Sequence, residues 1–393
     1  MDILLLGNGF DLYHKLPTKY INFLNTVNFL QENFNETDMP TIGKVFNDER
    51  LSGIDNGIKE CYEKYYTTYS NFPLNIEATK NLIELADKNV WFKYLSQLIN
   101  KDITWIDFEK EIEKVVRAFE HYFEKEQSEH ISFESLTSLE RNIIVKFDFF
   151  YCLVEDGMII NGKKKRWMVD DRYAFYNPID KITYVDKEKV ISYLYNQLIE
   201  LSEMLKLYLR HFIDDVVEKL SDVKLIEKHI DLSQISDVIT LNYTHTFEKL
   251  YSKGKERHIY HIHGDVEKNI ILGINSNESD NLETINTDFL CFKKYYQRVF
   301  YKTDVEYLLA LKYDDIFDSR NTNNLLVFGH SLDSTDKDVI IDLFMYSKQI
   351  TIYCYNEKAM SDNIRNLVNI YGRDGFDTLR SEKEMTFILL DDI

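Results

Sequence analysis

The sequence contains little cysteine, proline or glycine: its 393 residues include 4 Cys, 4 Pro and 13 Gly. The cysteines stand far apart, at positions 61, 152, 291 and 354, and form no Cys-x-x-Cys pair. This spacing argues against a disulfide framework and against a zinc knuckle, and predicts buried free thiols in a reducing compartment. The scarcity of Pro and Gly favours long, uninterrupted helices.

Positive charge is also scarce, because 47 Lys and Arg stand against 66 Asp and Glu and leave a net charge of −19. Binding to phosphate backbones requires a basic surface, so this balance argues against DNA, RNA and anionic lipid as main partners. No apolar run approaches the roughly 18 residues of a membrane span. We therefore expect a cytoplasmic protein that engages neither nucleic acid nor membrane.

The composition is otherwise that of a globular protein, with 44% hydrophobic and 29% charged residues. At about 150 residues per domain, the length predicts about two domains. Short apolar runs near both ends alternate with helical patterns such as 335–346 and 357–371, which predicts an α/β fold with a mostly parallel, Rossmann-like sheet. The predicted strands are 3–6, 238–241, 259–262, 270–272, 325–328, 350–355 and 386–390.

The middle of the chain has a different pattern, in which apolar residues recur at intervals of three and four. This periodicity predicts helices over about 77–99, 105–123, 139–154 and 190–212. Because strands are predicted on both sides, we expect residues 35–232 to form a large, mostly helical insertion. Residues 1–34 and 233–393 would together form the α/β domain.

The first predicted strand is followed by Gly7-Asn8-Gly9-Phe10-Asp11. Backbone amides at this place can hold a diphosphate, so these five residues are candidates for nucleotide binding. Leu12 occupies the third glycine position of the Gly-x-Gly-x-x-Gly fingerprint, which disfavours a hydride-transfer site. An ordinary tight turn explains the same residues equally well.

Polar residues also follow two later strands: Asn242 comes after 238–241 and His263 after 259–262. In open α/β sheets, ligands bind at the carboxyl ends of the strands, so both residues are candidates for catalysis. Taken singly, each is as readily explained as a turn former or a buried polar residue.

Gly329, His330 and Ser331 follow the strand 325–328. The small Gly and Ser would let the backbone approach an adenosine or ribose, which makes this a second candidate nucleotide-binding loop. The alternative is helix capping alone, for which Ser334, Thr335 and Asp336 are candidates.

Three histidines, His258, His261 and His263, raise the possibility of a metal site. Strand periodicity places 261 and 263 on one face and 258 on the other, so that with Asp265 only three ligands remain, short of a closed zinc site. We therefore expect no metal. Asp107 and Glu109 do not share a helix face and are expected to stabilise a helix start.

In combination, these motifs resemble the AbiH family of bacterial phage abortive-infection proteins. The matching pieces, in the family's order, are 7–11, 16–20 with Phe23, 105–109, 242–248, 261–264 and 329–333. More distantly they resemble sirtuin-like NAD-binding domains. That resemblance implies that Asn242 positions water and ribose and that His263 is a general base. The chain has no zinc-binding cysteine tetrad, so peptide deacylation is not implied.

We therefore expect an antiphage abortive-infection effector that hydrolyses NAD or a related nucleotide, with NAD as substrate rather than as a retained cofactor. A phage protein as trigger and a second copy of the chain are candidate partners. One alternative is a non-catalytic module that senses a nucleotide or a phage protein. A weaker one is a metal-dependent nuclease or phosphohydrolase.

Overall fold

The computed structural model of this chain falls into two compact units. Unit 1 comprises Met1–Ile83, Glu203–Ile271 and Arg298–Ile393, and unit 2 comprises Glu84–Ser202 and Leu272–Gln297. The structure describes residues 2–34, 74–99, 107–128, 136–155, 164–177, 182–217, 226–252, 254, 257–275, 287–312 and 324–390, with scattered residues between 41 and 64. The domain boundaries at 34 and 232 stay a prediction.

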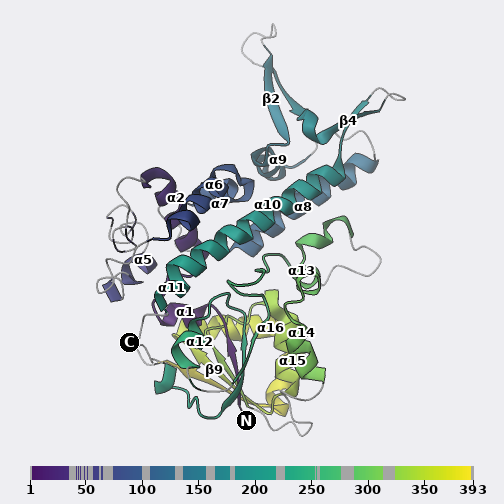
Figure 1. Ribbon diagram of the computed structural model, residues 1–393. Helices are drawn as coiled ribbons and strands as arrows, with labels where there is room; N and C mark the ends of the chain where they lie inside the picture. Colours follow the sequence, from purple (N-terminus) through teal and green to yellow (C-terminus); the bar gives the residue numbers. More distant parts are fainter. Residues whose placement is uncertain are drawn as a thin grey trace. The chain divides into compact units, whose positions relative to one another are not determined.

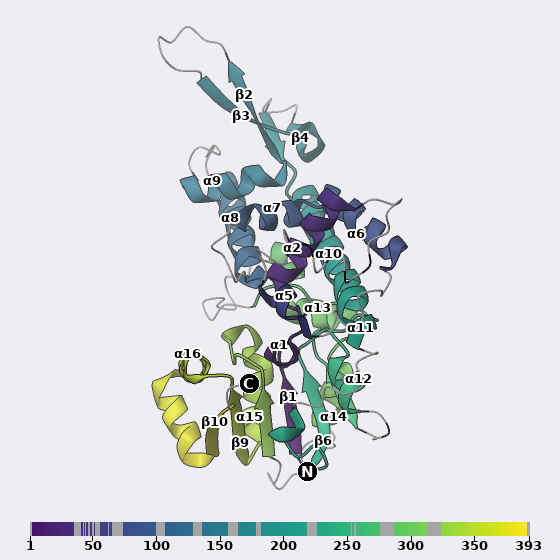
Figure 2. The same cartoon turned by 90° about the vertical axis from the view of Figure 1, so that its left-hand side faces the viewer.

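Unit 1 contains a six-stranded parallel sheet (Figure 2). Its strands are β1 (Asp2–Leu6), β6 (Ile235–Thr240), β7 (His258–His261), β8 (Asn324–Phe328), β9 (Gln349–Cys354) and β10 (Glu384–Leu389). The spatial order β7-β6-β1-β8-β9-β10 is 3-2-1-4-5-6 in chain order, which is the doubly wound Rossmann order. The predicted α/β, Rossmann-like sheet is thus confirmed.

The central strand β1 shows why the sequence folds in this way. Ile3, Leu4 and Leu5 are fully buried, and β1 pairs with β6 on one side and β8 on the other. A continuous apolar run is what a strand covered on both faces requires. The predicted strand at 270–272 is wrong, because Ile271 lies outside the sheet and donates its backbone N–H to the His263 carbonyl. A short buried loop and a short buried strand have the same apolar signature.

Helices cover the sheet of unit 1, and α15 and α16 contribute Ile340, Phe344, Leu367 and Ile370 to its core (Figure 1). The α16 helix is longer than predicted, and a kink at Gly372, with φ of 69°, interrupts it. The helices that lie within the described part of unit 1 are α1 (Gly9–Tyr13), α2 (Tyr20–Asn33), α5 (Asn56–Cys61), α12 (Thr246–Tyr251), α14 (Val305–Lys312), α15 (Lys337–Tyr346) and α16 (Glu357–Glu382).

Unit 2 has an aromatic core. Phe147 contacts Trp91 at 4.9 Å between ring centroids, and Phe119 contacts Phe149 at 5.3 Å. The elements here are α7 (Val90–Leu98), α8 (Phe108–Ser128), α9 (Ser138–Ile144) and η3 (Val145–Phe147), while α6 (Ile76–Lys88), α10 (Lys187–Tyr208) and α13 (Lys294–Tyr301) each have residues in both units. This confirms helices over most of the predicted stripes at 77–99 and 105–123.

The stripe predicted as one helix over 139–154 is only half helical. After η3 the chain forms β2 (Phe150–Glu155), which pairs with β3 (Lys164–Val169), and β4 (Ala174–Asn177) pairs with β5 (Ile182–Val185). Aromatic and β-branched residues such as Phe150 and Val154 favour strands. Over so short a run, the helical period of 3.6 residues and the strand period of 2 are hard to tell apart.

The long helix predicted over 190–212 is confirmed as α10, followed directly by a π-helical turn, η5 (Leu209–Asp214), and by α11 (Asp215–Val217) (Figure 1). Such π-turns are frequent at functional sites. Here the π-turn ends at the buried Asp214, which belongs to the site described below.

Of the motif at 105–109, residues 105 and 106 lie outside the described part of the chain. Asp107 accepts the Lys110 backbone N–H at 3.2 Å, as expected at a helix start. Glu109 instead forms an ion pair with the buried Lys294 at 2.8 Å. Among the helices that the structure describes, none combines the length and apolar character that crossing a membrane would demand.

Candidate active site at the strand ends of unit 1

The two predicted nucleotide-binding loops are neighbours at the point where the strand order reverses. Gly7-Asn8-Gly9 follows β1, and Gly329 with His330 follows β8. The Gly9 backbone N–H donates to the Gly329 carbonyl at 2.7 Å. Ligands of doubly wound sheets bind at this switch point, so the position is the expected one.

The glycines themselves are required by contact between the two loops. A Cβ atom on Gly9 would lie 2.6 Å from the Gly329 carbonyl oxygen. Gly329 has φ of +71°, and a Cβ atom there would lie 2.1 Å from the Phe10 nitrogen. The fold alone therefore explains both glycines, and a role in nucleotide binding stays a prediction.

The other loop candidates have different surroundings. Asn8 accepts a hydrogen bond from the Thr18 hydroxyl at 2.7 Å, and Phe10 is a core residue whose ring contacts His14 at 4.5 Å. Ser331 is exposed, and its carbonyl accepts a hydrogen bond from Asn366. Through these contacts Asn8 and Phe10 stabilise the loop and the core.

The predicted catalytic residues, Asn242 and His263, lie at the ends of neighbouring strands. In the β6–β7 register Thr240 pairs with His261, so each candidate stands two residues beyond a paired position. The two strand ends are also tied together, because His261 Nδ1 donates to the Asn242 carbonyl at 3.0 Å. The Asn242 carboxamide makes no hydrogen bond to another described residue. The structure thus places the two candidates on neighbouring strand ends.

His263 faces a carboxylate that comes from a third strand end. Its Nε2 lies 3.3 Å from Asp336 Oδ1, and His330 Nε2 lies 3.3 Å from the other oxygen, Oδ2. Because His330 Nδ1 accepts the Leu332 backbone N–H, the His330 proton is on Nε2 and points at Asp336. His263 is 4% exposed and Asp336 8%. A buried imidazole beside an oriented carboxylate is suited to general-base work.

The sequence predicts Asp336 as one of three candidate helix caps. The side chain that caps the turn η8 (Ser334–Asp336) is Asp333, which accepts the Thr335 backbone N–H at 3.1 Å. Asp336 is the N-cap residue of α15, as the sequence suggested, but its side chain makes no capping hydrogen bond. Its two carboxylate oxygens lie 3.3 Å from His263 Nε2 and His330 Nε2.

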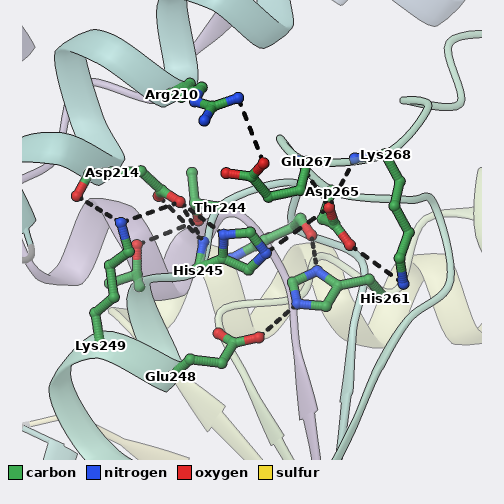
Figure 3. A network of polar contacts seen from close by, with 12 residues as sticks. Arg210, Asp214, Thr244, His245, Glu248, Lys249, His261, Asp265, Glu267 and Lys268 are labelled. Carbon is green, nitrogen blue, oxygen red and sulfur yellow. Dashed lines mark hydrogen bonds and ion pairs between the residues drawn. The ribbon is translucent and has the colours of Figure 1, made fainter.

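A second cluster lies at the same strand ends and consists of His245, Glu248 and His261 (Figure 3). His261 Nε2 is 2.6 Å from Glu248 Oε1. His245 Nδ1 is 2.9 Å from Asp214 Oδ2, and its Nε2 is 3.8 Å from Asp265 Oδ1. This cluster differs from the set that the sequence suggested, which was His261, His263 and Asp265. Since β7 ends at His261, strand alternation does not extend to His263, and the two rings have different carboxylate partners.

Buried acidic side chains surround this cluster, among them Asp11, Asp214 and Asp265. Burial raises the pKa of Asp11 to about 7, against the hydrogen bond from the Thr244 hydroxyl at 2.7 Å, and the charges of Asp214 and Glu248 raise it further. Burial alone would lower the pKa of His245, but the hydrogen bond to Asp214 and the surrounding carboxylates outweigh it and raise that pKa. Asp11 was predicted to contact a nucleotide, and its Oδ1 is buried with no hydrogen-bond partner in the described part of the chain.

Sequence reasoning did not select His245, Glu248 or Asp214 as site residues. A His followed three positions later by Glu at the start of a helix places both side chains on one face, so the first two could have been found by spacing. Asp214 comes from the π-turn at the end of the long helix. Only the folded chain brings it to His245.

The fold and the polar strand ends define a Rossmann-type α/β protein with a candidate site at the carboxyl edge of its sheet. The chain belongs to the AbiH family: a family model described as "Bacteriophage abortive infection AbiH" matches residues 3–355. This membership supports a role in phage abortive infection. Neither the curated proteins nor the solved structures include a match.

Proposed function

We propose that the strand-end site of unit 1 hydrolyses NAD or a related nucleotide, and that this activity carries the family's role in phage abortive infection. The observation that supports it most is the placement of Asn242 and His263 just beyond neighbouring strand ends, with Asp336 facing His263. The placement of the loops of Gly9 and Gly329 at the switch point of the sheet adds to it.

Hydrolysis of the glycosidic bond of NAD requires few catalytic groups. Water attacks C1′ of the nicotinamide ribose, a C–O bond forms, and the C–N bond to nicotinamide breaks with its electron pair moving into the cationic ring. The leaving group is therefore neutral and needs no acid. The His263 imidazole takes the proton of the attacking water, and the Asp336 carboxylate, 3.3 Å from Nε2, stabilises the imidazolium that results. The Asn242 carboxamide orients the water and the ribose.

A test on the purified chain identifies products as well as activity. The protein is incubated with NAD, alone and with an extract of phage-infected cells, and nicotinamide and ADP-ribose are quantified. His263→Ala and Asn242→Ala should each lose product formation while remaining folded. His258→Ala is the matched control, since its side chain is 79% exposed and lies at the other end of β7. Product formation by both variants at the parent rate would overturn the site assignment.

Metal-dependent phosphohydrolysis is the second candidate, and the cluster of His245, Glu248 and His261 favours it. The two reactions break different bonds of NAD. Cleavage at the pyrophosphate yields AMP and nicotinamide mononucleotide, whereas glycosidic cleavage yields free nicotinamide. Nucleotide binding without either set of products would favour the non-catalytic sensing module.

A further inference from the structure

We propose that His245, Glu248 and His261 form a binding site for one divalent transition-metal ion, with Zn²⁺ as the probe of choice. Each of these residues offers one ligand atom, and the three atoms lie within 4.8 Å of one another. Two come from the segment that opens α12 and the third from the end of β7 (Figure 3). This inference departs from the sequence-based expectation of no metal and is independent of NAD hydrolysis.

The hydrogen bonds of the two rings support it. His245 Nδ1 meets the Asp214 carboxylate at 2.9 Å, and His261 Nδ1 meets the Asn242 carbonyl at 3.0 Å. Neither a carboxylate nor a carbonyl oxygen can donate, so Nδ1 carries a proton in both rings. Metal-binding histidines have this arrangement, in which an outer acceptor holds Nδ1–H and directs Nε2 at the ion.

Both Nε2 atoms face further oxygens. For His261 the oxygen is Glu248 Oε1 at 2.6 Å, and for His245 it is Asp265 Oδ1 at 3.8 Å. A proton shared by His261 and Glu248 would satisfy the first pair, but 3.8 Å is too long for a hydrogen bond. One cation between the rings satisfies both nitrogens and also compensates Glu248, whose Oε2 is buried with no hydrogen-bond partner among the described residues.

The donor set indicates the class of ion. Two imidazoles and one carboxylate suit Zn²⁺ and its first-row neighbours, whereas Ca²⁺ and Mg²⁺ prefer oxygen ligands alone. Asp214 is well placed as the outer partner, because it also accepts the His245 backbone N–H and lies 3.6 Å from the Lys249 ammonium. Through His261, a bound ion would fix the strand end that carries Asn242.

The experiment measures binding directly. The full chain without a polyhistidine tag is stripped with chelator and titrated with Zn²⁺ by calorimetry, and elemental analysis gives the stoichiometry. We expect one ion per chain in the parent and loss of that ion in His245→Ala and His261→Ala. Asp214→Asn keeps all three ligands and should weaken binding by about 10- to 100-fold, the usual effect of an outer-shell change.

Two controls make the outcome decisive. His258→Ala and His263→Ala should bind Zn²⁺ like the parent, which separates this site from the histidines of the proposed hydrolysis. Circular dichroism confirms that each variant is folded, and Asp214→Asn serves if a ligand variant does not fold. No stoichiometric Zn²⁺ in the parent, or unchanged binding in folded His245→Ala or His261→Ala, or in Asp214→Asn, would overturn the proposal.

Discussion

His263 and Asp336 face each other at 3.3 Å between Nε2 and Oδ1, although they follow different strands of the sheet. Both are buried, and His330 lies at the second carboxylate oxygen at the same distance. The carboxylate is thus placed between two imidazoles, which limits its freedom to turn. We expect Asp336 to act as a positioning residue for His263.

The first prediction concerns this pair. Asp336→Asn should lower kcat/KM for nucleotide hydrolysis by about 100-fold, because the His263 imidazolium loses its compensating charge. It should also change the pH–rate profile, whereas the loss of a mere packing contact would leave that profile unchanged. Asp333→Asn is the control: it weakens a cap at a cost of about 1 kcal/mol or less in stability and should leave the pH profile as in the parent. An unchanged rate and profile in Asp336→Asn would exclude the positioning role.

The second prediction concerns the pH dependence of stability through Asp11. Its pKa is about 7 in the folded protein against the ordinary value of 3.8, so the native state keeps a proton that the unfolded chain releases between about pH 4 and 7. Its contribution to stability is therefore lost as pH rises through that window. Asp11→Asn should gain stability relative to the parent from pH 5 to pH 8, by a few kcal/mol at most. Urea unfolding at both pH values checks this, and equal differences at the two would contradict it.

His14 should have the opposite dependence. Burial lowers its pKa to about 4, and the ring donates from Nδ1 to the Phe10 carbonyl and accepts the Tyr251 hydroxyl at Nε2. The unfolded chain takes up a proton below about pH 6.5, so stability is lost as pH falls from 6.5 towards 4. In His14→Gln this loss should be smaller than in the parent when unfolding is measured at pH 7 and pH 5. A parallel loss in both proteins would contradict the assignment.

The fourth prediction separates loop contact from backbone strain. Gly329→Ala adds a methyl group that meets Phe10 and also strains a positive φ, whereas Gly372→Ala strains a similar φ with open space around it. The first should destabilise unit 1 by about 1–3 kcal/mol more than the second. Thermal unfolding of the two variants checks this. Equal losses would mean that the loops do not pack as described.

The centre of the sheet was predictable because its strands β1 and β8 are almost wholly apolar. Leu4 and Val327 belong to runs too short for helices and are bounded by turn residues. Ile271 belongs to such a run without joining the sheet, since burial alone does not create a strand partner. Sequence also placed Asn242 and His263 at the strand ends. It did not identify Asp214 or Asp336 as site residues, because their role depends on tertiary contacts with distant histidines.

The central claim is tested most directly by the nucleotide pools of phage-infected cells. NAD and other nucleotides are measured over the course of infection in cells carrying the parent, His263→Ala or the control His258→Ala. We predict that NAD or a related nucleotide falls with the parent and the control, while with His263→Ala the pool stays intact and protection is lost. Protection by the parent with unchanged pools, or depletion and protection with His263→Ala equal to the parent, would contradict nucleotide hydrolysis at this site.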